Sequence, residues 1–132
     1  MSWRDRLKKI DQEYIRKGAA KIDRADLERL LARAEEITAR FAREHGLERY
    51  YNDACLLVDM LGDYYNGSYR QVPWWAIAAV VFSLLYVLNP FDLIPDFLPV
   101  IGIADDIAVV AVLLKMIEKE LEHYRRWKSG GT

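Results

Sequence analysis

Four aspartates lie in one short apolar stretch, and carboxylates at this density could bind a metal ion. The stretch covers residues 89–106 and reads NPFDLIPDFLPVIGIADD. If the four carboxylates come together, they repel one another, raise one another's pKa values and attract a hard cation such as Mg²⁺ or Ca²⁺. The sequence therefore predicts a candidate site for a divalent cation, the one cofactor it suggests, at Asp92, Asp96, Asp105 and Asp106.

The same aspartates also have a structural interpretation, which we favour. Pro90 suits the first position of a helical turn whose N–H groups Asp92 can accept, and the pattern repeats at Asp96. Asp105 and Asp106 fall where the last predicted helix begins, and the helix dipole favours negative charge there. The spacing does not match a calcium-binding loop, and no histidine lies nearby to suggest zinc. The sequence is compatible with both interpretations.

Other reactive residue types in the sequence have no catalytic companions. His45 and His123 lie in charged segments, and Cys55 falls among the apolar positions of a predicted helix. Ser83 lies inside an apolar helix, where its hydroxyl can donate to a carbonyl one turn back. Glycine-rich phosphate loops are absent from the sequence. We therefore predict no catalytic residue, and more generally a protein that is not an enzyme.

Length and composition set broad limits on the protein. A chain of 132 residues is typical of one domain with its own core, and its net charge of −1 gives no reason to expect a nucleic-acid partner. One cysteine cannot form an intrachain disulfide, and the first residues are charged throughout, unlike a signal peptide. We expect an intracellular protein, in the cytoplasm or at the cytoplasmic face of the membrane.

The spacing of apolar residues predicts helices throughout and no strand. We expect an all-α, compact bundle of about five helices, with the aspartate- and proline-rich connection between the last two. An N-terminal amphipathic helix occupies residues 1–22, and the bundle occupies residues 23–128. The second helix begins at an N-cap, either Asp23 or Asp26. The predicted helices cover 1–22, 23–46, 47–66, 73–88 and 104–127.

The helix from Pro73 to Leu88 carries no charged residue and must be surrounded by protein or by lipid. At about 1.5 Å per residue its length is about 24 Å, less than the roughly 30 Å of a bilayer's hydrocarbon core. A hairpin over residues 73–114 could insert, but it would bring aspartates into the membrane at high cost. We favour a helix buried in the bundle.

Two groups of residues are candidates for contact with a membrane surface or a protein partner. The first is a stripe on the N-terminal helix, which is flanked by basic residues and which could alternatively form a core face or the seam of a homodimer. The second is a tryptophan pair, which could anchor at a bilayer interface or pack in the core. The stripe is Trp3, Leu7, Ile10 and Tyr14, and the pair is Trp74 and Trp75.

The stretch YVLNPFDLIPDFLPVIGIADDIAVV resembles the core motif of the YkvA-like family of small bacterial proteins, also described as the domain of unknown function 1232. The resemblance covers about residues 56–116, with Asn89 and Phe91 as mild departures from the motif. The matching positions are Tyr86, Pro90, Asp92, Leu93, Ile94, Pro95, Asp96, Pro99, Gly102, Asp105 and Asp106. The family's members are generally uncharacterized and often predicted to be membrane-associated.

From these observations we predict an uncharacterized, non-enzymatic accessory protein that associates with a membrane or binds a partner. The alternative is a divalent-cation-binding protein or cation-dependent enzyme that uses the four aspartates.

Overall fold

The computed structural model describes residues 11–88 and 106–130, and the regular elements in these ranges are all helical. The predicted all-α class is therefore confirmed. The helices are α2 (Gln12–Ala19), α3 (Arg24–Ala32), α4 (Ala34–Arg43), the short 3₁₀ helix η1 (Glu48–Tyr50), α5 (Tyr51–Tyr65), α6 (Trp74–Leu88), α8 (Asp106–Met116) and α9 (Glu118–Lys128).

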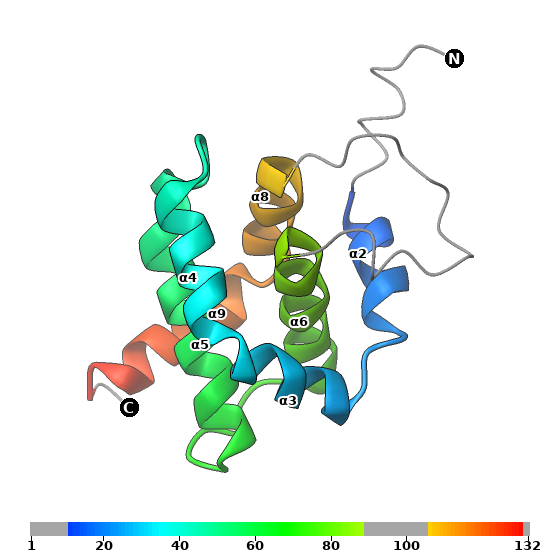
Figure 1. The fold of residues 1–132 in the computed structure, drawn as a ribbon. Coiled ribbons are helices and arrows are strands. Elements are labelled where there is room, and N and C mark those ends of the chain that lie inside the picture. The colour runs from blue at the N-terminus through cyan, green and yellow to red at the C-terminus, as the bar shows by residue number, and fades with distance from the viewer. Residues whose placement is uncertain (1–10, 89–105, 131–132) are drawn as a thin grey trace.

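These are seven α-helices in the described ranges, more than the expected count of about five, because two predicted helices are each divided in two. The backbone leaves helical geometry at Arg33 (φ −112°, ψ 22°) and at Ile117 (φ −108°, ψ 21°). Figure 1 shows that α4 runs steeply away from the direction of α3. Each change of direction lets the helices before and after it both direct apolar residues into the core. The sequence has neither proline nor glycine at these points, so its periodicity does not reveal them.

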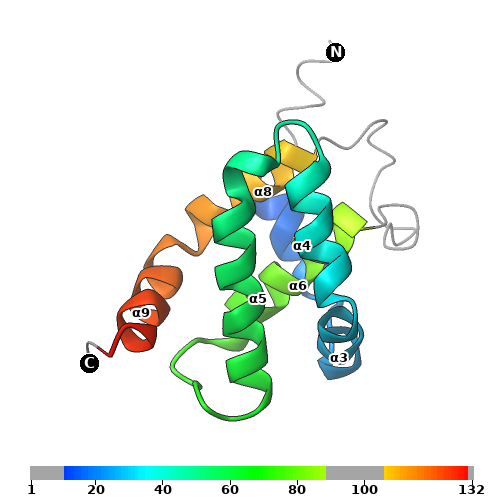
Figure 2. The ribbon, with the colours of Figure 1, turned by 60° about the vertical axis from the view of Figure 1, so that its left-hand side comes forward.

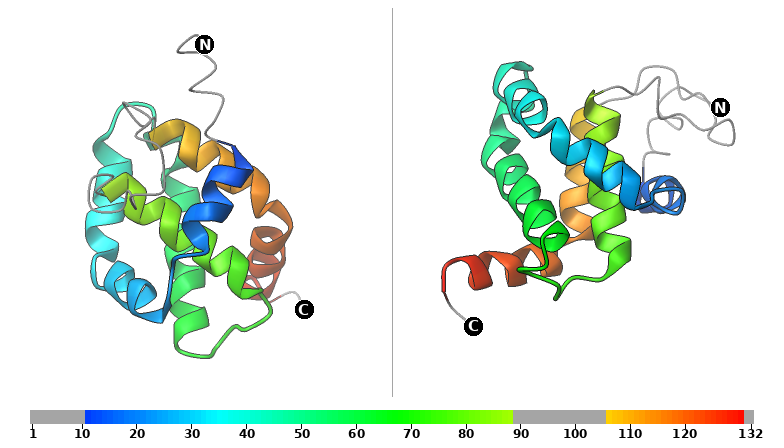
Figure 3. Two further views of the ribbon diagram at one scale, coloured as in Figure 1. Left: turned by 90° about the vertical axis from the view of Figure 1, so that its right-hand side faces the viewer. Right: turned by 60° about the horizontal axis from the view of Figure 1, so that its bottom comes forward.

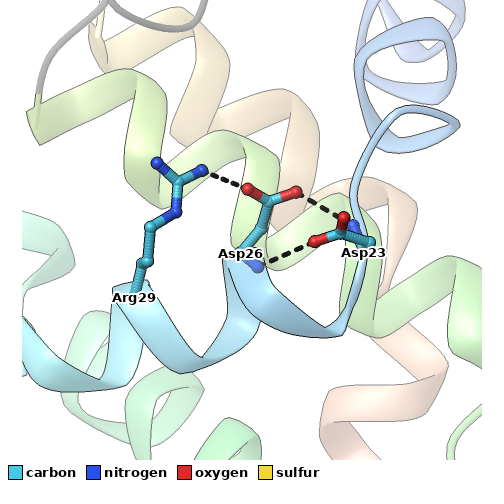
Figure 4. Close-up of polar contacts among 3 residues, drawn as sticks. All are labelled: Asp23, Asp26 and Arg29. Atoms are coloured by element: carbon cyan, nitrogen blue, oxygen red, sulfur yellow. Dashed lines mark hydrogen bonds and ion pairs between the residues drawn. The ribbon is translucent and has the colours of Figure 1, made fainter.

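An aspartate pair begins α3 and settles which residue is its N-cap. The Asp26 N–H donates to Oδ1 of Asp23 (3.0 Å), and the Asp23 N–H donates to Oδ2 of Asp26 (2.9 Å). Asp23 is therefore the N-cap, and Asp26 completes a capping box beside Arg29 (Figure 4). Burial opposes ionisation of Asp26, but the bond from the Asp23 N–H and the guanidinium of Arg29 hold its pKa below the usual value.

The apolar helix α6 lies at the centre of the molecule. Its residues from Ala76 to Val87 are all buried, and α2, α3, α4 and α8 pack around it (Figures 1 and 3). The helix without a charged face is thus covered by other helices, as expected for an apolar segment inside a protein. Within residues 11–88 and 106–130, none of the helices combines the length and the apolar character needed to cross a membrane.

Helix α2 packs closely on α6 because of a glycine. A Cβ atom at Gly18 would lie 2.2 Å from Cε1 of the buried Phe82 ring, so this side of α2 admits no larger residue without movement. One turn before Gly18, the Tyr14 ring is edge-on to the rings of Phe82 and Tyr86, with centroids 5.9 and 6.3 Å away. Tyr14 therefore lies in the core.

Helix α9 packs against α5 at the edge of the bundle (Figure 2). The Tyr124 hydroxyl donates to Oδ2 of Asp63 on α5 at 2.5 Å. Burial and the Asp63 carboxylate raise the pKa of this hydroxyl. The centroid of the Tyr124 ring lies 5.1 Å from that of the Tyr69 ring and 5.7 Å from that of the Trp127 ring. An aromatic cluster with one charged hydrogen bond thus holds the C-terminal helix in place.

Candidate functional site

The tryptophan pair lies at the exposed end of the buried helix α6. Its first turn is closed by the Pro73 carbonyl, which accepts from the N–H groups of Ala76 (3.1 Å) and Ile77 (3.4 Å). Because Trp74 and Trp75 precede the part of α6 that the other helices cover, their side chains reach solvent, with 39% and 43% of their surface exposed. These exposures are unusual for large apolar residues and mark a candidate binding surface.

A pocket of about 310 Å³ opens beside the tryptophans, where α2 ends against α6 and α8. Small side chains line the space: Ala19, which ends α2, its C-cap residue Ala20, and Ala78 on α6. A side chain larger than alanine at any of these positions would reduce the volume. The complete lining is Arg16, Ala19, Ala20, Trp74, Trp75, Ala78 and Met116.

The electrostatic character of this pocket is positive. Arg16 is the charged member of the lining, and its guanidinium forms no ion pair with any residue that the structure describes. The neighbouring Lys17, in contrast, pairs with Glu13 at 3.5 Å. The first turn of α6 contains no acidic residue, so the partial positive charge of its N-terminus is not neutralised locally. The pocket therefore favours a ligand with an apolar body and a negative group.

Aromatic and basic side chains extend the exposed surface beyond the pocket. The Tyr64 ring lies 6.3 Å from the Trp74 ring, and the Arg70 guanidinium lies over the Tyr64 ring at 4.8 Å from its centroid. We call the surface formed by Arg16, Tyr64, Arg70, Trp74 and Trp75 the Trp74 face. Tryptophan, tyrosine and arginine together are typical of surfaces that meet the interfacial layer of a membrane.

Of the four predicted cation ligands, the structure describes Asp106. It lies in the first turn of α8 with 14% of its side chain exposed, and Oδ2 is 3.6 Å from a guanidinium nitrogen of Arg40. The same nitrogen of Arg40 also lies 3.2 Å from Glu44. Asp92, Asp96 and Asp105 lie outside the described residues, and within those residues no three potential metal ligands gather. The cation site remains a prediction.

The other predicted contact residues are divided in the same way. Trp3, Leu7 and Ile10 lie outside the described residues, whereas Tyr14 of the same stripe is buried between α2 and α6. The predicted use of this stripe by a membrane, a partner or a second copy thus stays a prediction.

The remaining polar candidates lie apart from the pocket. His45 and His123 are exposed, as expected for solvated histidines, and Cys55 is half-buried. Ser83 is fully buried, but its hydroxyl has no hydrogen-bond partner among the described residues, so the predicted bond to a carbonyl one turn back is wrong. None of these side chains lines the pocket beside the tryptophans.

Sequence reasoning identified the tryptophans but missed most of the pocket. Arg16, Ala19 and Ala20 come from the end of α2, and Met116 ends α8, so the lining joins segments far apart in the chain. The run Gly18-Ala19-Ala20 is the available sequence signal, because consecutive small residues in an amphipathic helix indicate a close approach to another element or a space beside it.

Comparison with known proteins finds a family that matches the motif. Residues 76–112 match the family model described as "Protein of unknown function (DUF1232)". The chain is similar to "Uncharacterized membrane protein YkvA" of Bacillus subtilis (strain 168), with 35% identity over 69 residues, which cover 52% of this chain and 65% of that relative. No solved structure gives a significant match. The resemblance predicted from the motif is therefore confirmed: residues 76–112 match the model of the DUF1232 family of proteins of unknown function.

Proposed function

We propose that this chain is a non-enzymatic accessory protein that binds a membrane surface, at the cytoplasmic face, through the Trp74 face. The observation that carries the proposal is the exposure of Trp74 and Trp75, 39% and 43%, at the end of a helix that is otherwise buried. The description of the relative from Bacillus subtilis as a membrane protein supports it. The basic side chains of the face add attraction to anionic lipid.

The expected strength of this binding is modest. Moving the exposed part of one tryptophan out of water contributes about 2 kcal/mol. An arginine close to an anionic surface contributes about 1 kcal/mol. Two tryptophans with Arg16 and Arg70 then give about 6 kcal/mol, similar to a single acyl anchor and therefore reversible. Because part of this free energy is electrostatic, high salt should weaken the binding.

Flotation with lipid vesicles tests the proposal. The full-length chain should float with vesicles that contain an anionic lipid, and less with pure phosphatidylcholine. The double substitution Trp74→Ala/Trp75→Ala should abolish flotation, because it removes the apolar contribution. Tyr51→Ala is a matched control, since Tyr51 is 39% exposed and begins α5, away from the start of α6 in Figure 1.

Either of two flotation results would contradict the proposal. If the double variant floats as well as the unchanged chain, the Trp74 face does not bind the membrane. If Tyr51→Ala weakens flotation to the same extent, exposed aromatic residues act without regard to position, and the assignment of this face fails.

A further inference from the structure

We infer that the pocket between α2, α6 and α8 holds one acyl chain of an anionic lipid, whose head group pairs with Arg16 near the N-terminus of α6. The inference rests on the proposed membrane-surface function and adds a ligand class to it. The chain would then bind an individual lipid molecule, in addition to adsorbing on a bilayer. Three properties of the pocket support this choice: its volume, its lining and its charge.

The volume and lining suit a single hydrocarbon chain. About 310 Å³ lies at the lower end of the range of pockets that bind small ligands, roughly 300–1,000 Å³. Ala19 and Ala78 are buried apolar members of the lining, and Trp74 and Trp75 are its exposed aromatic members. Met116 adds a flexible side chain that can adapt to an irregular ligand. Since an acyl chain forms no hydrogen bonds, it leaves no polar group unsatisfied in such a pocket.

The charge of the pocket selects the head group. Arg16 is exposed beside the apolar lining and has no acidic partner among the described residues. A guanidinium binds a phosphate or carboxylate with two parallel hydrogen bonds, and the free end of the α6 dipole favours the same sign of charge. A zwitterionic head group would bring its own positive charge close to Arg16, so it would gain less binding free energy than an anionic head group does.

A second copy of the chain fits this surface poorly. In a symmetric dimer each subunit presents the same patch, so the basic Trp74 face of one subunit would lie against the same face of its partner. Arg16 and Arg70 would then meet like charges, which is unfavourable at an interface. An anionic lipid matches both the apolar lining and the basic charge.

The test uses single-chain amphiphiles below their micelle concentrations, so that no bilayer or micelle is present. Dodecyl phosphate is the anionic probe, and dodecylphosphocholine has the same chain with a zwitterionic head group. Binding is followed by the indole N–H signals of Trp74 and Trp75 in ¹H–¹⁵N spectra of the full chain, assigned with the two single alanine variants. We expect saturable shifts and a Kd about tenfold lower for dodecyl phosphate than for dodecylphosphocholine.

Two variants separate the two parts of the inference. Ala20→Leu adds bulk at an exposed position of the lining and should raise the Kd for dodecyl phosphate about tenfold. Arg16→Gln should remove the preference for dodecyl phosphate and lower the affinity for dodecylphosphocholine much less. Ala32→Leu, at an exposed alanine that ends α3, is the matched control and should change neither Kd. Thermal unfolding of each variant shows that it is folded.

Several outcomes overturn the inference. If the unchanged chain floats with vesicles but neither amphiphile shifts the indole signals, the membrane-surface function stands and the acyl-chain site fails. If Ala20→Leu binds dodecyl phosphate as tightly as the unchanged chain does, the pocket is not the site. If the indole signals shift with protein concentration and not with amphiphile, a second copy occupies the face. If the amphiphile binds as expected but the chain does not float, the proposed membrane-surface function fails separately.

Discussion

Asp106 lies where two stabilising interactions act on one carboxylate. It is in the first turn of α8, where the helix dipole favours negative charge, and its Oδ2 is 3.6 Å from Arg40 on α4. Arg40 also reaches Glu44, so one guanidinium links the end of α4 to the start of α8. These contacts agree with the structural interpretation of this aspartate, which needs no bound cation.

Substitution of this aspartate distinguishes the two interpretations. Asp106→Asn should lower the free energy of unfolding by about 0.5–1.5 kcal/mol, because it weakens both the dipole interaction and the Arg40 pair. Thermal unfolding with and without millimolar Mg²⁺, Ca²⁺ or Mn²⁺ should show the same loss. Asp53→Asn is a control outside the motif, since Asp53 also pairs with an arginine, Arg125, at 3.6 Å.

A cation site would give a different pattern. The thermal midpoint of the unchanged chain would rise to a plateau with added ion, Asp106→Asn would abolish that rise, and Asp53→Asn would keep it. Such a result would establish the cation-binding alternative.

Among the elements, α2 and α6 make the closest approach that the structure describes around a glycine in a helix. The Cβ position of Gly18 lies 2.2–2.5 Å from three carbons of the Phe82 ring, and the ring is buried in the core. Neither the ring nor the helix can move without disturbing the Tyr14, Phe82 and Tyr86 cluster. The glycine is therefore a packing requirement of this helix pair.

Replacement of this glycine should destabilise the protein despite the better helix propensity of alanine. In Gly18→Ala, overpacking costs about 1–3 kcal/mol, while the helix gains at most about 1 kcal/mol. Gly62→Ala on α5 is the matched control: no atom lies within 4 Å of its Cβ position, so this change should stabilise by about 0.5–1 kcal/mol. Urea unfolding measures both. If Gly18→Ala stabilises the protein as the control does, the close approach at Gly18 does not constrain the packing of α2 on α6.

The boundaries of these elements were predictable where the sequence carries a local signal. Asn66-Gly67-Ser68 ends α5 as predicted, since Gly67 has a φ of +87°, which favours glycine. The divisions at Arg33 and Ile117 have no such signal, because the apolar stripe continues across both and only tertiary packing bends the chain. The pocket was unpredictable for a related reason: its volume depends on how far α2 lies from α6 and α8, and no single segment encodes that distance.

Over the whole molecule, stability is unevenly distributed. Helix α6 is surrounded by four helices, whereas α9 contributes Leu121 and Tyr124 to the same core from the edge of the bundle, where it packs against α5. Its attachment depends on the Tyr124 hydrogen bond to Asp63, the rings of Tyr69 and Trp127, and two ion pairs, Lys128 with Asp59 and Arg125 with Asp53. Because α9 lies at the edge of the bundle and packs mainly against one helix, it should open before the rest of the molecule unfolds.

Tyr124→Phe tests this expectation. Loss of the hydroxyl leaves Asp63 without its donor, and should cost about 1–2 kcal/mol and speed hydrogen exchange in α9 more than in α6. Tyr50→Phe removes the same atom from a half-buried tyrosine in η1 and should change neither quantity. If the substitution speeds hydrogen exchange equally in α6 and α9, the expectation that α9 opens separately is wrong.

The same variant should alter the response to alkaline pH. Because the pKa of Tyr124 is raised in the folded state, its contribution to stability is complete below about pH 10 and is lost as the pH rises further. The Tyr124→Phe variant has no hydroxyl to ionise at this position, so it does not lose this stability as the pH rises. The difference in stability between the unchanged chain and the variant should therefore narrow above about pH 10, as measured by urea unfolding at a series of pH values.

The position of α6 in the chain also bears on how the protein is made. A charge-free helix is the segment most prone to aggregate while a nascent chain is incomplete. Three of the helices that cover it, α2, α3 and α4, precede it in the sequence, and α8 follows. When α6 leaves the ribosome, three of the described helices that pack on it have already been synthesised and can cover it, and the side that contacts α8 is covered later.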